Sequence, residues 1–191
     1  MTWLNHAKEL NCVMNDLSAF KNDGAETGID TAFLLWKKTT LLIREEKRTI
    51  FLIGNGASAS MASHAAADLA KNARVRTEVF SDLSLITAFA NDMGYENVFV
   101  EPLRRYMCTG DMLVAISSSG QSQNVIRATE EANNLGGFVV TLSAMKRENK
   151  LRSMGMLNFY IPADTYGMAE TCHAAILHYW IDQMVYLSKG V

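Results

Sequence analysis

Long apolar runs, paired cysteines and an excess of charge of either sign are all absent from this sequence of 191 residues. No run approaches the roughly 18 apolar residues that a membrane-spanning helix needs. The three cysteines are odd in number and lack metal-binding spacing, which is typical of reduced cytosolic thiols. A net charge of −2 gives no reason to expect a nucleic-acid or membrane surface. We therefore expect a soluble cytoplasmic protein that binds neither nucleic acid nor membrane.

Proline is scarce in the sequence, and a secretory signal is not expected. The two prolines, Pro102 and Pro162, leave most helical patterns uninterrupted. The N-terminus lacks a basic segment followed by an apolar one, so no secretory signal is expected. Because 49% of the residues are hydrophobic and only 20% are charged, the chain should fold around a core as one domain.

Helical and strand-like segments alternate after an all-helical start. Apolar residues recur at helical spacing over 2–20 and 29–46. From residue 49 onward, short β-branched or apolar segments alternate with helical ones, which predicts a parallel sheet covered by helices on both faces. The expected strands are 49–53, 77–80, 112–116, 138–143 and 158–161. The expected helices are 57–72, 84–90, 96–107, 122–135 and 168–188.

The segment that follows the first expected strand is the most informative in the chain. It reads GNGASASMASHAAAD over 54–68 and combines a glycine turn with the start of a helix. Free backbone N–H groups and the helix dipole favour a bound anion there. His64 and Asp68 share one helix face at i and i+4, so they are placed to ligate a metal or to move a proton.

A second polar loop, SSSGQS at 117–122, follows the strand at 112–116. Serine hydroxyls and backbone amides at a helix N-terminus form a neutral cradle for a phosphate dianion. The alternative is a serine-rich turn that only caps the helix. Because ligands bind at the carboxyl ends of parallel strands, two such loops in one sheet favour the phosphate site.

A dinucleotide site fits the first loop less well. Ala59 stands where the GxGxxG fingerprint has its third glycine. No acidic residue follows the second strand, which ends at Phe80, to hold a ribose. A nicotinamide-dependent dehydrogenase is therefore not expected.

The last expected helix carries Glu170, His173 and His178 in an otherwise apolar sequence. Burying titratable groups is costly unless each is paired or bound to metal. Two imidazoles and two carboxylates would suit a zinc-like divalent ion and acid–base chemistry. The four residues that would supply them are His64, Asp68, Glu170 and His178. The spacing leaves open whether the two helices meet within one subunit or between subunits.

Four motifs carry a resemblance to a known family. They read GNGASASMASHAAADL at 54–69, FANDMGYENVF at 89–99, AISSSGQSQNVI at 115–126 and YGMAETCHAAILHYWID at 166–182. With them the chain resembles the sugar isomerase (SIS) family, and within it the phosphoheptose isomerases, over essentially its full length. The resemblance implies one SIS domain over 1–191, an α/β flavodoxin-like αβα sandwich with a five-stranded parallel sheet and two extra N-terminal helices. Residues 1–46 would serve packing or oligomerisation, and residues 47–191 would form the αβα core.

The resemblance also implies an activity and an assembly. The activity is the interconversion of sedoheptulose 7-phosphate and D-glycero-D-manno-heptose 7-phosphate through an enediol, for heptose and surface-glycan biosynthesis. The assembly is a homotetramer with active sites near subunit contacts and one divalent metal ion, zinc, expected in each subunit.

Site residues carried over from the resemblance serve the substrate, the metal or the chemistry. Asn55 and Asp92 would contact the sugar hydroxyls. The other substrate-binding positions are Gly56, Ser58, Ser117, Ser118, Ser119 and Ser122. The metal positions are His64, Asp68, Glu170 and His178, and the last three of these would also be catalytic.

The sequence departs from the family pattern at four positions. Ala57 replaces a usual glycine, and Met61 stands where many members have aspartate. Asp68 replaces the usual catalytic glutamate and is one methylene shorter, while Glu170 replaces a glutamine. These changes bear on the metal and on the choice of sugar more than on the fold.

The expected mechanism is an aldose–ketose isomerisation. The two loops would hold the distal phosphate and so position the far end of the sugar. A metal or a protonated histidine would polarise the carbonyl. Asp68 or Glu170 would remove the proton next to the carbonyl, and His178 would return it or move protons between the oxygens.

Three other functions share part of these features. A non-catalytic phosphosugar-binding relative, regulatory or associated with a replication initiator, would keep the loops without needing two histidines and two carboxylates. Another isomerase of the family, acting on a hexulose phosphate or arabinose 5-phosphate, would keep the loops as well as the two histidines and two carboxylates. A structural protein whose serine loops are only helix caps explains none of the coincidences.

Overall fold

The computed structural model describes residues 2–188 of the chain, with side chains through residue 185. Its centre is a seven-stranded sheet in the order β2-β1-β7-β6-β5-β3-β4. The five parallel strands are β3 (Thr49–Gly54), β4 (Arg76–Val79), β5 (Met112–Ser117), β6 (Phe138–Ala144) and β7 (Leu157–Ile161). These strands follow the flavodoxin-like order, with the first parallel strand between the second and the third. The prediction of a parallel, flavodoxin-like sheet is confirmed.

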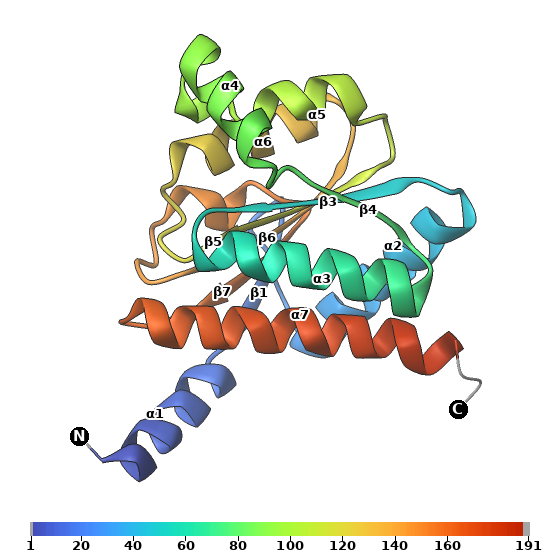
Figure 1. Cartoon of the computed structure of the whole chain (residues 1–191). Coiled ribbons are helices and arrows are strands. Elements are labelled where there is room, and N and C mark those ends of the chain that lie inside the picture. Colours follow the sequence, from blue (N-terminus) through green and yellow to red (C-terminus); the bar gives the residue numbers. More distant parts are fainter. Residues whose placement is uncertain (1, 189–191) are drawn as a thin grey trace.

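Helices cover both faces of the sheet (Figure 1). The helices on one face are α2 (Ile29–Glu45), α3 (Ala57–Ala73) and α7 (Tyr166–Ser188). The helices on the other face are α4 (Leu83–Met93), α5 (Val100–Tyr106) and α6 (Gln123–Asn134). An apolar cluster fills the space between the sheet and each helical layer, which confirms the three-layer αβα architecture.

The sheet has seven strands rather than the predicted five, because an N-terminal hairpin extends one edge. The predicted helix over 2–20 ends early: α1 (Trp3–Asn15) gives way to β1 (Ser18–Lys21). β1 pairs antiparallel with β7 and buries Ala19 completely, so pairing with the sheet overrides the helical pattern. β2 (Glu26–Thr27) then pairs antiparallel with β1.

The predicted helix over 96–107 is also divided. A 3-10 turn at Tyr95–Asn97 precedes α5, and Gly94 ends α4 with φ at +86°. Pro102 lies in the first turn of α5, where its missing N–H removes no helical hydrogen bond. Of the range expected to form one domain, residue 1 and residues 189–191 lie outside the described residues.

Tryptophan stacking joins α2 to the last helix. The rings of Trp36 and Trp180 stack with centroids 4.1 Å apart, and both side chains are fully buried. Trp180 Nε1 donates a hydrogen bond of 3.0 Å to Thr40 Oγ1. The pair fixes α7 against the N-terminal half of the molecule and so sets where its site residues lie.

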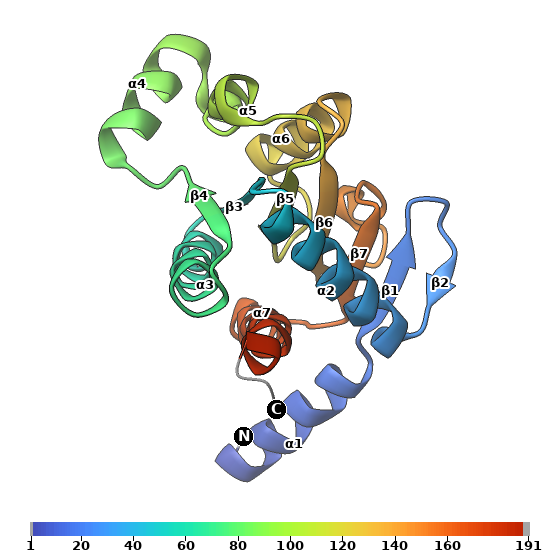
Figure 2. The same cartoon turned by 90° about the vertical axis from the view of Figure 1, so that its right-hand side faces the viewer.

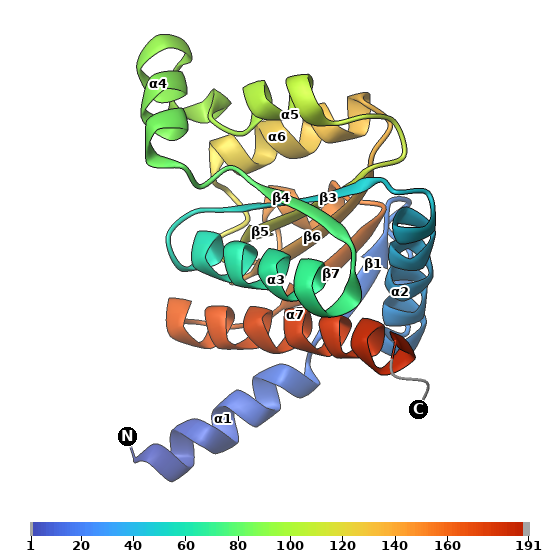
Figure 3. The ribbon, with the colours of Figure 1, turned by 45° about the vertical axis from the view of Figure 1, so that its right-hand side comes forward.

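The first helix behaves differently from the second. α1 extends away from the body of the molecule (Figures 2 and 3), and none of its residues is buried. Trp3 is 80% exposed and Leu4 63% exposed, so this apolar side of the helix has no cover within residues 2–188. No helix in that range combines the length and hydropathy needed to cross a membrane.

Candidate active site

The first loop joins β3 to α3 through two glycines. A side chain at Gly54 would place its Cβ only 2.6 Å from Ser58 Cβ, so glycine lets the helix begin close to the strand end. Gly56 has φ at +55°, in the left-handed region that glycine adopts readily. The N-terminus of α3 therefore opens directly at the carboxyl end of the sheet, where its free N–H groups favour an anion.

The serine loop joins β5 to α6 next to the first loop, because β3 and β5 are adjacent parallel strands. Together the loops and the start of α7 enclose a pocket of about 260 Å³. It is lined by Asn55, Gly56, Ala57, Ser58, Ile116, Ser117, Ser118, Ser119, Ser122, Tyr166 and Glu170. Every predicted substrate-binding residue except Asp92 is among them.

The loops offer hydroxyl and amide groups to this pocket rather than cations. Ser117 Oγ donates to Ser122 Oγ at 3.3 Å and accepts from the Gly120 N–H at 3.2 Å. Ser118 Oγ is buried and has no hydrogen-bond partner within residues 2–188. A buried hydroxyl without a partner is rare in a folded protein, and a phosphate oxygen would satisfy it.

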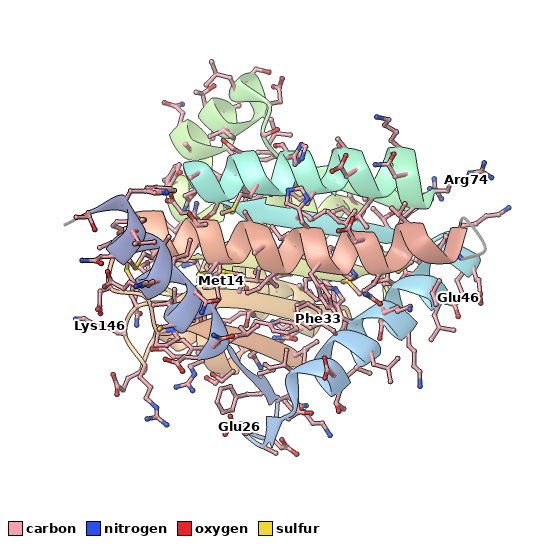
Figure 4. All side chains as sticks on the ribbon, turned by 90° about the horizontal axis from the view of Figure 1, so that it is seen from below. Met14, Glu26, Phe33, Glu46, Arg74 and Lys146 are labelled. Atoms are coloured by element: carbon pink, nitrogen blue, oxygen red, sulfur yellow. The ribbon has the colours of Figure 1, made fainter. Side chains whose placement is uncertain are left out.

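A second group of site residues lies where α3 and α7 run side by side (Figure 4). His64 Nε2 lies 3.4 Å from Asp68 Oδ2, and the rings of His64 and His178 have centroids 5.4 Å apart. One ligand atom from each of the three residues lies within 4.8 Å of the others. Two imidazoles and a carboxylate at this separation fit a divalent metal ion.

Glu170 is separated from this cluster within the subunit. It lines the serine pocket, eight residues before His178 on the same helix, and is not part of the three-residue group. Eight residues of α-helix advance about 12 Å along the axis. The four residues expected to bind one metal are therefore divided between two places in a single chain.

Asp92 also lies apart from the pocket. It is exposed on α4 and accepts a hydrogen bond of 2.8 Å from Asn91 Nδ2. Its expected role in sugar binding stays a prediction.

His173 has a different environment from the other two histidines of the site motifs. It is fully buried, and neither ring nitrogen makes a hydrogen bond within the described residues. Burial lowers the pKa of its imidazole to about 4. His173 is therefore neutral at pH 7 and belongs to the core rather than to the cluster.

Two residues near the pocket were not identified from the sequence. Tyr166 lines the pocket at the start of α7 and is the first residue of the fourth motif, to which the sequence alone gives no role. Asn124 pairs with Asn55 by two hydrogen bonds of 2.9 and 2.8 Å. The position of Asn124 just after the serine loop could have indicated a role in the pocket, but an asparagine at the start of a helix usually serves as a cap.

A match to a family model shows to which protein family the chain belongs. The SIS domain model matches residues 26–144, which contain both loops. The chain belongs to the SIS domain family. A phosphoheptose isomerase of Helicobacter pylori (strain Shi470) is 36% identical to this SIS domain protein over 145 residues, 72% of this chain and 74% of the relative. Another, of Aquifex aeolicus (strain VF5), is 29% identical over 135 residues, 68% of this chain and 70% of the relative.

Solved structures show the same SIS fold. The phosphoheptose isomerase of Neisseria gonorrhoeae superposes with a TM-score of 0.81 at 24% identity, over 95% of this chain and 96% of that one. The enzyme of Francisella tularensis gives 0.80 at 22% identity, over 96% and 98% of the two chains. The resemblance predicted from the four motifs is confirmed.

Proposed function

We propose that this SIS domain protein is a cytoplasmic phosphoheptose isomerase, which converts sedoheptulose 7-phosphate to D-glycero-D-manno-heptose 7-phosphate for heptose and surface-glycan biosynthesis. The observation that carries the proposal is the combination of a serine-lined pocket with the His64–Asp68–His178 cluster on adjacent helices. A protein that only binds a phosphosugar needs the pocket but not the cluster. The relatives that are called phosphoheptose isomerases support the same activity.

The serine pocket would hold the phosphate of the sugar. Hydroxyls of Ser58, Ser118 and Ser119 and the N-termini of α3 and α6 provide donors there without a lysine or arginine. A fixed phosphate converts binding energy into positioning of the reacting carbons at the other end. Glu170, the one carboxylate in the lining, would face the sugar rather than the phosphate, since like charges repel.

The chemistry would be a proton transfer between neighbouring carbons. A carboxylate, Asp68 or Glu170, takes the proton from the carbon beside the carbonyl, and the freed electron pair forms the enediol double bond. The carbonyl oxygen receives a proton from His178. Return of a proton to the former carbonyl carbon and loss of one from the other oxygen give the isomer with no net change in composition.

His64, Asp68 and His178 would hold the metal ion, which we propose is zinc. When bound, a divalent ion supplies Lewis-acid stabilisation of negative charge on the substrate oxygens. Asp68 is one methylene shorter than the usual family glutamate, so its carboxylate stays close to the His64 ring on the same helix face.

We further propose that each site is completed across subunits of a homotetramer. Because Glu170 and His178 lie about 12 Å apart along one continuous helix, Glu170 would reach the metal cluster of a neighbouring copy rather than its own. Exposed apolar side chains on α1 and α4, such as Trp3 and Leu83, support burial against other copies. An apolar pocket of about 370 Å³ between α1, α2 and α7, walled by Met14 and Phe33 (Figure 4), supports the same assembly.

A substrate panel tests the proposed activity. Purified full-length protein should isomerise sedoheptulose 7-phosphate faster than a hexulose phosphate or arabinose 5-phosphate, contain about one zinc per subunit, and lose turnover with a chelator. Binding of these sugar phosphates without turnover would identify a phosphosugar-binding protein instead. Faster turnover of the five-carbon sugar would identify another isomerase of the family.

A further inference from the structure

A pair of asparagine side chains links the two loops of the pocket. Asn55 belongs to the first loop, and Asn124 is the second residue of α6, directly after the serine loop. Each Nδ2 donates to the Oδ1 of the other residue, at 2.9 and 2.8 Å. Asn124 is only 2% exposed, so this amide pair is shielded from competing water.

A backbone group fixes which way round both amides lie. The Val125 N–H donates to Asn124 Oδ1 at 3.0 Å, and a backbone N–H can only donate. The atom that it meets must therefore be the oxygen, which leaves Asn124 Nδ2 to donate to Asn55. Asn55 in turn must present its oxygen to Asn124 Nδ2, so the orientation of both side chains follows from one unambiguous donor.

Tyr95 completes the hydrogen bonds of the Asn55 oxygen. Its hydroxyl donates to Asn55 Oδ1 at 3.1 Å, and with Asn124 Nδ2 it occupies both lone pairs of that oxygen. One N–H of Asn55 is used by Asn124. Within residues 2–188 the second N–H has no partner in the protein, and Asn55 lines the serine pocket.

We propose that Asn124 and Tyr95 are positioning residues that make Asn55 a donor-only group in the pocket. The ligand atom opposite Asn55 must then be a hydrogen-bond acceptor, an oxygen of either the phosphate or the sugar. The inference rests on the proposed function in one respect: the pocket binds a sugar phosphate. Because Asn124 acts through Asn55, neither positioning residue needs to touch the ligand.

A double-mutant cycle tests this indirect action. The dissociation constants for inorganic phosphate and for sedoheptulose 7-phosphate are measured for Asn124→Ala, Asn55→Ala and the double variant. Each single change should weaken binding about tenfold, and the double variant should bind no more weakly than Asn55→Ala alone. Losses that multiply to about a hundredfold would show that Asn124 acts independently of Asn55, and would overturn the proposal. Weakening toward inorganic phosphate marks a phosphate oxygen as the acceptor, and weakening toward the sugar phosphate alone marks a sugar oxygen.

A second variant keeps the test valid if Asn124→Ala folds poorly. Tyr95 is 54% exposed, so Tyr95→Phe should not affect folding. Tyr95→Phe should weaken binding of the affected ligand about threefold in the native protein and should not change its binding in the Asn55→Ala background. Unchanged affinity in Tyr95→Phe, or the same loss in both backgrounds, contradicts the proposal.

The matched control is Asn133→Ala on the same helix. It removes an exposed amide whose Nδ2 donates to the Met154 carbonyl at 2.8 Å, far along α6 from the pocket, and should leave both affinities unchanged. Binding is measured at equilibrium and separately from the rate of turnover, and inorganic phosphate cannot be converted at all, so the two proposals fail separately. A coupled binding pattern in a protein without isomerase activity would refute only the proposed function.

Discussion

At the scale of single residues, burial determines the charge of His173. Its imidazole keeps a pKa of about 4 in the folded protein, against 6.5 as the ordinary value. Between these two pH values the unfolded chain binds a proton that the folded chain does not, so stability falls as pH is lowered through this window. Above pH 6.5 the residue has no such effect.

This difference predicts a pH-dependent stability. When the pH is lowered from 7 to 4, the unfolding free energy of the native protein should fall by about 3 kcal/mol more than that of a His173→Gln variant. Urea unfolding at both pH values measures the difference. Parallel losses in the two proteins would show that the His173 ring is protonated in the folded state.

Asp68 is the residue at which the chemistry is most open to test. Asp68→Asn keeps the size of the side chain but removes one of the two proposed bases and the charge beside His64, so we expect kcat to fall at least about a hundredfold. Asp68→Glu restores the usual family residue and should stay within about tenfold of the native kcat. Asp16→Asn, an exposed change of the same kind at the end of α1, is the control. Near-normal turnover in Asp68→Asn would remove Asp68 from the acid–base chemistry.

At the scale of elements, the serine loop is held from behind by the end of β6 and by the segment that follows it. Backbone N–H groups of Ala144 and Leu151 donate to the carbonyls of Ser118 and Gly120, each at 3.1 Å. Asn149 packs against Gly120, and its amide is fixed by hydrogen bonds to the carbonyls of Ala144 and Lys146. The conformation of the serine loop thus depends on a segment with no residue in the pocket lining.

Gly120→Ala should disrupt this packing. Gly120 has φ at +61°, and a Cβ there would lie 2.0 Å from Asn149 Oδ1, which is itself held by the Arg152 N–H. We expect a loss of about 2–4 kcal/mol in unfolding free energy, together with weaker phosphate binding. Gly167→Ala, where no atom lies within 4 Å of the added Cβ, should be close to neutral. Equal stabilities of the two variants in thermal unfolding would contradict the buttressing role.

Some of the strands could be predicted from the sequence, and one could not. The strands at 49–54 and 112–117 were predictable because apolar runs end on glycine or serine, which also located both loops. β1 was not, because Ser18–Lys21 continues the helical spacing of α1 and becomes a strand only by pairing with β7. Local pattern carries no information about such a distant partner.

The site shows a similar division. His64 and Asp68 were predictable as neighbours because one helical turn separates them, and the approach of His178 follows only from the packing of α3 on α7. The separation of Glu170 from His178 was available from helical geometry, but the family resemblance grouped them together. The amide orientation at Asn55 depends on a backbone N–H in the first turn of α6, so no pattern in the sequence could predict it.

At the scale of the whole molecule, shared sites predict recovery of activity by mixing. Glu170→Ala and His178→Ala should each be nearly inactive alone. If Glu170 of one copy completes the cluster of another, tetramers containing both variants should regain up to about a quarter of native activity. Co-expression with two affinity tags, followed by tandem purification and assay, measures this. Activity no higher than that of the separate variants would place each site within one chain.

The central claim is that the pocket and the cluster together move a proton on a bound heptose phosphate. The most direct measurement is proton NMR of sedoheptulose 7-phosphate in D₂O with the purified full-length protein. We predict formation of the aldose with deuterium from solvent at the carbon beside the carbonyl. In Asp68→Asn we predict neither aldose formation nor deuterium incorporation. Binding of the sugar phosphate with neither isomerisation nor deuterium exchange would contradict the claim.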